Sequence, residues 1–96
     1  MKFLALEKEI AQAQSADYQP YLRAEAARLY ELYQTGIVRE CYFHQTEHTA
    51  VLVLESASLE QAQEALDSLP LVEAGLIRFE VIPLTPYTGF ARLFQG

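Results

Sequence analysis

The chain has 96 residues, of which 51% are hydrophobic and 11% aromatic, and its formal net charge is −6. This composition excludes intrinsic disorder and fits one globular domain, whose modest size makes oligomerisation a natural supplement to stability. A nucleic-acid partner is not expected, because the seven Lys and Arg residues are outnumbered and do not cluster.

The sequence carries no signal for export or for a membrane. The N-terminal stretch MKFLALEKEI contains Glu7 and Glu9 where a signal peptide would continue apolar. The longest apolar run, residues 50–54, is far shorter than the roughly 20 residues that cross a bilayer. Cys41 is the only cysteine, so no disulfide can form within one chain. We therefore expect one cytoplasmic domain over residues 1–96 with no membrane contact.

The first third of the chain predicts a strand followed by a helix. Residues 2–8 are largely apolar and indicate a buried strand, whereas the pattern of residues 10–16 leaves their conformation open. Residues 18–35 predict an amphipathic helix, with Pro20 in its first turn and Gly36 as a left-handed cap. Its apolar positions recur at intervals of three and four: Tyr18, Leu22, Ala26, Leu29 and Tyr33.

Residues 36–55 predict a β-hairpin around which the rest of the chain is organised. Its strands are expected near residues 37–45 and 48–55, on either side of a short polar turn. The run 50–54 is apolar at every position, which a strand tolerates only when both faces of its sheet are covered. We therefore expect Val51 and Leu52 both to be buried.

The second half predicts another helix, a last strand and an apolar tail. Ser58 and Gln61 form a capping-box pattern that begins a helix over 58–69, and Pro70 ends it. Residues 71–75 are then a short connection, and residues 77–84 a strand that Pro83 predicts either to fray or to lie at an edge. The tail 85–96 is too apolar to be a solvated segment, since it carries Tyr87, Phe90, Leu93 and Phe94.

This order of elements predicts an α+β fold of the ferredoxin-like βαββαβ type. It has a four-stranded antiparallel sheet with both helices on one face. The other face of the sheet still carries apolar side chains from the run 50–54. This leaves more apolar surface exposed than a monomer usually has. We therefore predict at least a homodimer, paired sheet against sheet, with the tail docked on the partner.

Residues 36–87 resemble the muconolactone isomerase family. The resemblance is carried by Gly36, Arg39, His48 with Ala50 two residues on, the helix start at Ser58, and the block Ser68-Leu69-Pro70-Leu71. It implies a dimeric α+β barrel made from two ferredoxin-like sheets. It also implies isomerisation or oxidation of small, often aromatic-derived acids, commonly without a cofactor, in a cavity between sheet and helices.

Arg39 and His48 are the first candidates for catalytic residues. A guanidinium among apolar strand neighbours can hold a carboxylate by two parallel hydrogen bonds, although it can equally form a salt bridge with a nearby Glu. An imidazole can move a proton near neutral pH, although a histidine in a turn is commonly just solvated.

Three further residues are candidates for the walls of a site. His44 and Tyr42 alternate on one face of the strand 37–45, so they either share a pocket wall as proton donor and acceptor or simply pack there. Tyr33 is one of four tyrosines on the helix 18–35, and it is a ligand-binding candidate if the helix covers a pocket.

No metal or cofactor is expected. His44, Glu47 and His48 are residue types that suit zinc, but a turn splays them and no fourth ligand is nearby. Cys41 lies among apolar strand residues, where a thiol acts as a small hydrophobe. The sequence has no Gly-rich phosphate loop, no Gly-x-Ser-x-Gly turn and no dinucleotide fingerprint.

Two functions follow as hypotheses. The first is a cofactor-free, isomerase-like proton shift on a small organic acid, with Arg39 as anchor and His48 or His44 as proton shuttle. The alternative is a non-catalytic module on the same barrel that binds a small ligand or a protein. The two differ in whether Arg39 and a histidine point into one cavity.

Overall fold

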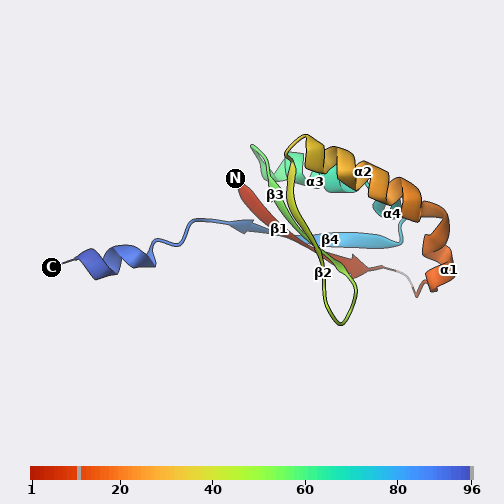
Figure 1. The fold of residues 1–96 in the computed structure, drawn as a ribbon, viewed down its shortest axis with the longest axis horizontal. Coiled ribbons are helices and arrows are strands. Elements are labelled where there is room, and N and C mark those ends of the chain that lie inside the picture. The colour runs from red at the N-terminus through yellow and green to blue at the C-terminus, as the bar shows by residue number, and fades with distance from the viewer. Residues whose placement is uncertain (11, 96) are drawn as a thin grey trace.

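Four strands form one antiparallel sheet in the order β2-β3-β1-β4 (Figure 1). The structure is a computed structural model that describes residues 1–10 and 12–95. Ala11, in the segment whose conformation the sequence leaves open, and Gly96, the last residue of the predicted tail, lie outside the described residues. The strands are β1 (Lys2–Glu9), β2 (Val38–Phe43), β3 (Ala50–Glu55) and β4 (Ile77–Leu84).

The helices that connect these strands cover one face of the sheet (Figure 1). They are α1 (Ser15–Tyr18), the 3₁₀ turn η1 (Gln19–Tyr21), α2 (Leu22–Gln34), α3 (Leu59–Asp67) and α4 (Pro70–Glu73), and a second 3₁₀ segment, η2 (Gly89–Phe94), follows β4. The order and the single covered face confirm the predicted α+β, ferredoxin-like class. The helix predicted over 18–35 is divided, since Pro20 lies in the 3₁₀ turn and α2 begins at Leu22.

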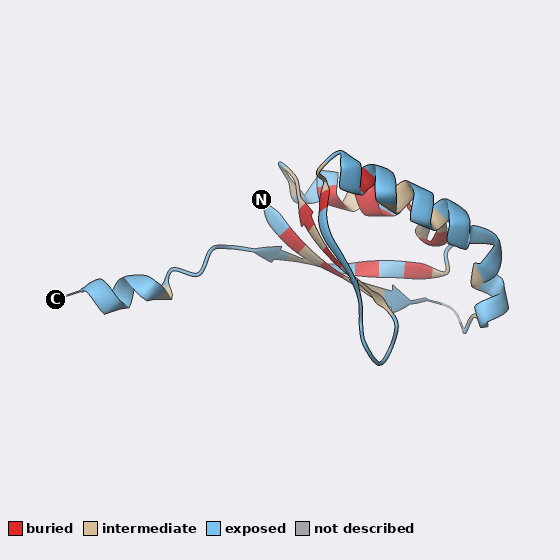
Figure 2. Ribbon diagram, in the orientation of Figure 1, coloured by how far each residue is buried: buried red, intermediate tan, exposed pale blue. Residues whose placement is uncertain are grey.

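The core lies between the helices and the sheet. Phe3 and Ala5 of β1 and Leu52 and Leu54 of β3 face the helices and are buried (Figure 2). β3 is an inner strand between β1 and β2, as its apolar run predicts. The expectation that Val51 and Leu52 would both be buried is met by Leu52 alone. Val51 points to the opposite side, which the helices do not cover, and is only half-buried.

The side of the sheet away from the helices, here the outer face, has an apolar centre. Five half-buried side chains share it by strand register: Leu4, Leu6, Val51, Val53 and Ile82. Leu4 lies between Val53 and Ile82, so the patch crosses three adjacent strands. β2 and β4 are the two edge strands, which agrees with the edge position predicted from Pro83.

A β-bulge in β2 changes which side chains face the helices. Val38 lies opposite Leu54 and Glu40 lies opposite Val53, so Arg39 is the extra residue. Beyond the bulge, Cys41 pairs with Leu52 on the helix side, while Tyr42 pairs with Val51 on the outer face. β2 ends at Phe43, two residues before the predicted boundary.

Pro70 begins a helix as well as ending one. The helix α3 ends at Asp67, and Leu69 is extended (φ −73°, ψ 132°) because a residue before proline avoids the helical region. Pro70 then occupies the first turn of α4, where its missing N–H costs nothing. The short connection expected over 71–75 is therefore largely helical, and this corrects the prediction.

The segment that follows β4, residues Thr85 to Gln95, is here named the C-terminal arm. It extends from the end of β4 away from the sheet and the helices, and it contains η2 (Figure 1). Figure 2 shows it exposed along almost its whole length. Within the described residues, no helix is long and apolar enough to span a membrane.

Candidate functional site

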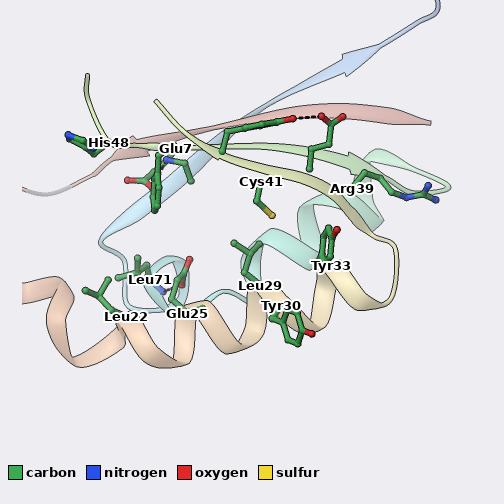
Figure 3. Close-up of a pocket in the computed structure, with 15 residues that line it drawn as sticks. Glu7, Leu22, Glu25, Leu29, Tyr30, Tyr33, Arg39, Cys41, His48 and Leu71 are labelled. Atoms are coloured by element: carbon green, nitrogen blue, oxygen red, sulfur yellow. Dashed lines mark hydrogen bonds between the residues drawn. The ribbon is translucent and has the colours of Figure 1, made fainter. Parts of the chain in front are cut away.

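A cavity of about 930 Å³ lies between α2 and the sheet, at the end of the sheet that carries the β2–β3 hairpin (Figure 3). Its lining is mainly apolar and includes Leu22, Leu29 and Leu71. Its size falls within the range of about 300–1,000 Å³ that is typical of small-molecule sites. Two carboxylates, a thiol and a histidine are among the groups that interrupt this apolar lining: Glu7, Glu25, Cys41 and His48.

Glu7 enters the cavity from the sheet. It alternates with Phe3 and Ala5 along β1, so its side chain lies on the helix side. One carboxylate oxygen, Oε1, accepts a hydrogen bond from the Ala50 N–H at 3.0 Å. Burial raises the pKa of Glu7; the hydrogen bond from Ala50 opposes this and the charge of Glu9 adds to it.

Glu25 faces the sheet from α2 (Figure 3). Its Oε1 accepts a hydrogen bond of 2.9 Å from the Leu71 N–H, in the first turn of α4. Burial raises the pKa of Glu25; the Leu71 hydrogen bond lowers it, and the negative charge of Glu7 raises it further. The two carboxylates therefore interact across the cavity, and each has one oxygen held by a backbone N–H.

His48 lies at the rim of the cavity, in the hairpin turn between β2 and β3. Figure 3 shows its ring on the outer side of the rim. Its backbone has φ 58°, and among the described residues it is the one non-glycine with a positive φ. Such a conformation costs about 1 kcal/mol or more for a residue with a Cβ, and strain of this kind is concentrated at functional sites.

Arg39 lies at the opposite end of the same cavity. Its Nε donates a hydrogen bond of 2.6 Å to the Gly36 carbonyl, and its terminal nitrogens point away from the cavity centre (Figure 3). Among the described residues that line the cavity it is the one Lys or Arg. The structure does not bring Arg39 and His48 together, because Arg39 lies at the bulge near the start of β2 and His48 lies in the turn beyond its end.

His44 shapes the hairpin turn. It lies just beyond β2, so it does not continue the alternation with Tyr42 on which a shared wall depended. Its Nδ1 accepts hydrogen bonds from the backbone N–H groups of Thr46, at 3.2 Å, and Glu47, at 3.0 Å. This geometry places the proton of a neutral ring on Nε2.

The candidate tyrosines take different positions. The Tyr42 hydroxyl donates a hydrogen bond of 2.6 Å to Glu40. Both residues border the cavity from the edge strand β2, although by register their side chains lie on the outer face. This hydrogen bond raises the pKa of Tyr42, and the charge of Glu40 acts in the same direction. Tyr33 lines the cavity from α2 and rises toward β2 (Figure 3).

Cys41 faces the cavity from β2 because of the bulge. Figure 3 shows its sulfur directed from the sheet toward α2. Burial raises the pKa of its thiol, so the thiolate that a nucleophile requires is disfavoured. The raised pKa argues against a nucleophilic role, but Cys41 is exposed, so the expectation that it packs as a small hydrophobe is not met.

Comparisons with known proteins bear on the fold. No family model matches the sequence, and no curated protein is similar to it. Among solved structures, muconolactone isomerase is similar over 92% of each chain, with 20% identity and a TM-score of 0.75. The 5-chloro-2-hydroxyhydroquinone dehydrochlorinase of Burkholderia phenoliruptrix AC1100, in complex with 2,5-dihydroxybenzoquinone, is similar over 93% of this chain and 98% of that one, with 18% identity and a TM-score of 0.62.

The chain has a muconolactone isomerase-like fold. At these identities the likeness concerns the fold, which can carry different sites. The muconolactone isomerase-like fold explains why the cavity lies between the helices and the sheet, while the side chains within it belong to this sequence.

Sequence reasoning missed both carboxylates of this site. Each lies in phase with an apolar series: Glu7 continues the alternation of Phe3 and Ala5, and Glu25 lies between Leu22 and Leu29 at helical spacing. An acid in phase with a buried pattern was the available signal. Among the described residues, no three His, Cys, Asp or Glu side chains gather into a group that could hold a metal ion.

Proposed function

We propose that this cavity binds a small organic acid and catalyses a cofactor-free proton shift. The observation that carries the proposal is the pair of carboxylates, Glu7 and Glu25, on facing walls of a mainly apolar cavity with raised pKa values. A general base works best when its pKa approaches the operating pH, and burial next to a like charge is the usual way to raise a carboxyl pKa.

The chemistry requires nothing beyond the chain and its substrate. In a proton shift, one carboxylate takes a proton from a C–H bond, and the electron pair of that bond forms a new double bond to the adjacent carbon. The electron pair of the neighbouring double bond is displaced to its far atom, where a proton returns. Glu25 is the proposed base, because its free oxygen faces the cavity while Oε1 is held by Leu71. Glu7 is the proposed partner that holds or returns the proton.

Charge sets the orientation of the substrate. A substrate carboxylate placed between Glu7 and Glu25 is repelled by both, so the acid group must lie elsewhere. Arg39 at the far rim is the proposed anchor for the carboxylate, a role that requires its terminal N–H groups to turn toward the cavity from the outward position they have in this structure. His48 at the other rim is the proposed route for protons between the cavity and water.

The test uses muconolactone, the compound in the name of the first structural neighbour. Proton NMR in D₂O follows conversion of the lactone or exchange of its C–H protons for deuterium. Glu25→Gln and Glu7→Gln each keep an oxygen for the backbone N–H and remove the base, so we expect the rate to fall by about 10²–10⁴. Glu60→Gln, an exposed acid on α3, is the matched control and should react like the wild type.

A non-catalytic binding module is the second candidate, and one observation favours it. Arg39 and His48 do not converge, and each carboxylate already satisfies a backbone N–H at the start of an element. The NMR experiment separates the two functions. Shifted lactone signals without conversion or exchange in the wild type indicate the module, whereas equal turnover by Glu25→Gln and the wild type contradicts the proposed base.

The proposal includes pairing of two copies through the outer face. Its five half-buried apolar side chains form a continuous patch on three strands. Burial of apolar surface contributes about 25 cal/mol per Å², which favours covering such a patch. Sedimentation at micromolar chain concentration tests the pairing, and a folded monomer there contradicts it.

A further inference from the structure

A second groove, of about 660 Å³, lies where the end of α2, the start of β2, the end of β3 and α3 meet, and it is here named the polar groove. Its floor is apolar, since Leu32 and Ala65 line it and are 2% and 6% exposed. Among the described residues, Arg39 is the one that lines both this groove and the cavity. The polar groove is large enough for a small molecule, and the proposed proton shift uses none of its other side chains.

Arg39 presents its guanidinium to the polar groove rather than to the cavity. Figure 3 shows its terminal nitrogens pointing away from the cavity. A Cβ on Gly36, which lines the polar groove, would lie 3.9 Å from the Arg39 Nε and 4.0 Å from its Nη2. Nε is held by the Gly36 carbonyl at 2.6 Å, so the side chain is fixed while its terminal N–H groups can hold a carboxylate by two parallel hydrogen bonds.

Two other charged side chains of the polar groove already have partners. Arg28 pairs through Nη1 with Glu31 Oε2 at 3.1 Å, and its Nε donates a hydrogen bond of 2.9 Å to Ser68 Oγ. Glu55 Oε1 pairs with the amino group of Met1 at 3.2 Å. These two side chains therefore need no ligand to balance their charge.

Arg39 and Glu64 are the charged side chains of the polar groove that remain, and neither forms an ion pair within residues 1–10 and 12–95. They lie on different walls, near the start of β2 and in the middle of α3. A simple anion in this groove is attracted by one of them and repelled by the other, whereas a ligand with both charges complements both. The apolar floor adds a preference for an apolar substituent.

We propose that the polar groove binds an α-amino acid with an apolar side chain. Arg39 holds its carboxylate, Glu64 holds its ammonium group, and its side chain lies against Leu32 and Ala65. This site is separate from the cavity and goes beyond the proposed function. The two sites compete for Arg39, a consequence that rests on the proposed role of Arg39 in the cavity.

Leucine is the probe, and its binding is measured without the lactone, so the result does not depend on turnover in the cavity. The ¹⁵N-labelled protein is titrated with leucine and followed by the NMR signals of its backbone N–H groups. Those of Gly36 and Ala65 report on the polar groove, and those of Ala26 and Ala50 report on the cavity. Two matched compounds each lack one charge: 4-methylpentanoate is leucine without the amino group, and 3-methylbutylamine is leucine without the carboxylate.

Two variants remove one charge each from the protein, and each has a matched control. Arg39→Gln is compared with Arg23→Gln, an exposed arginine on α2 that does not line the groove. Glu64→Gln is compared with Glu60→Gln, an exposed acid one turn earlier on α3. All four side chains are exposed, so the spectra of the free variants should otherwise match that of the wild type.

The proposal predicts that leucine shifts the signals of Gly36 and Ala65 and leaves those of Ala26 and Ala50 in place. Arg39→Gln and Glu64→Gln should each weaken leucine binding by about tenfold or more, as should removal of either charge from the ligand, because each loses a hydrogen bond between charged groups. The two control variants should bind like the wild type.

Three results overturn the proposal. The first is the absence of any shift at Gly36 and Ala65 up to the solubility limit of leucine. The second is a set of shifts confined to Ala26 and Ala50, which places the ligand in the cavity. The third is equal affinity for leucine and 4-methylpentanoate, or equal affinity of Glu64→Gln and the wild type for leucine, since either result means that the groove does not recognise the ammonium group.

Discussion

The layer between the helices and the sheet has two unlike ends. Near the start of β1, Phe3, Leu32 and Leu54 are almost completely buried, and we call this the filled end. Near the hairpin, Glu7 and Glu25 border an open cavity. The same helix, α2, spans both ends, so the difference comes from the side chains and from what else covers them.

The two ends of α2 therefore differ in role: one stabilises the fold, and the other borders the candidate site. A filled end provides the apolar burial that holds the sheet on the helices. An open end with buried acids costs stability, because desolvation of a carboxylate is unfavourable, and such groups are retained mainly where a site uses them. Five changes of residue test how far this separation holds.

The largest effect is expected from shortening two leucines on α2. Leu32 lies at the filled end and is 2% exposed, so Leu32→Ala should lower the free energy of unfolding by about 2–5 kcal/mol. Leu29→Ala lies at the cavity, where the lost side chain already borders open space, and should cost clearly less. Urea unfolding at one fixed chain concentration measures both, since association shifts apparent stability. Equal losses contradict the contrast between the two ends.

The filled end was the more predictable of the two. The apolar run of β3 correctly indicated an inner strand, Pro83 an edge strand, and Gly36 a left-handed cap, which has φ 85°. These are local rules that depend on one residue type or one period. They hold wherever the chain is packed in the ordinary way.

The open end was less predictable because its geometry depends on pairing. The bulge at Arg39 shifts the phase of β2 by one residue, so that the side chain of Cys41 and not that of Tyr42 is on the helix side of the sheet. No local pattern shows this shift, because it is fixed by the register with β3. The carboxylates Glu7 and Glu25 were missed for a related reason: an acid in a buried series looks like an exposed residue until its partners are known.

A smaller effect is expected in the pH dependence of stability. The folded pKa of Glu25 is raised above its ordinary value of 4.5. The folded state therefore binds the proton of Glu25 more tightly than the unfolded chain does. The stability that protonated Glu25 contributes is fully present below about pH 4.5 and is lost as pH rises through the folded pKa. Glu25→Gln keeps the acceptor for the Leu71 N–H and cannot titrate. The stability of this variant relative to the wild type, measured as the difference between their free energies of unfolding, should therefore increase from pH 4 to pH 7. A constant difference over this range contradicts the raised pKa.

The smallest effect on stability is expected at His48, where it separates a strained turn from a chemical role. The positive φ of His48 suits glycine, which adopts it without a clash, although glycine also gains freedom in the unfolded chain. His48→Gly should therefore leave the unfolding free energy unchanged or raise it by up to about 1 kcal/mol. The same variant removes the proposed proton route at the cavity rim, so turnover of muconolactone should fall while folding is retained.

His44→Asn provides the comparison in the same turn: its amide oxygen can replace the Nδ1 acceptor, and it leaves His48 in place. If His48→Gly loses stability while His44→Asn does not, the imidazole of His48 has a structural role, and the strain at this position does not mark a functional site.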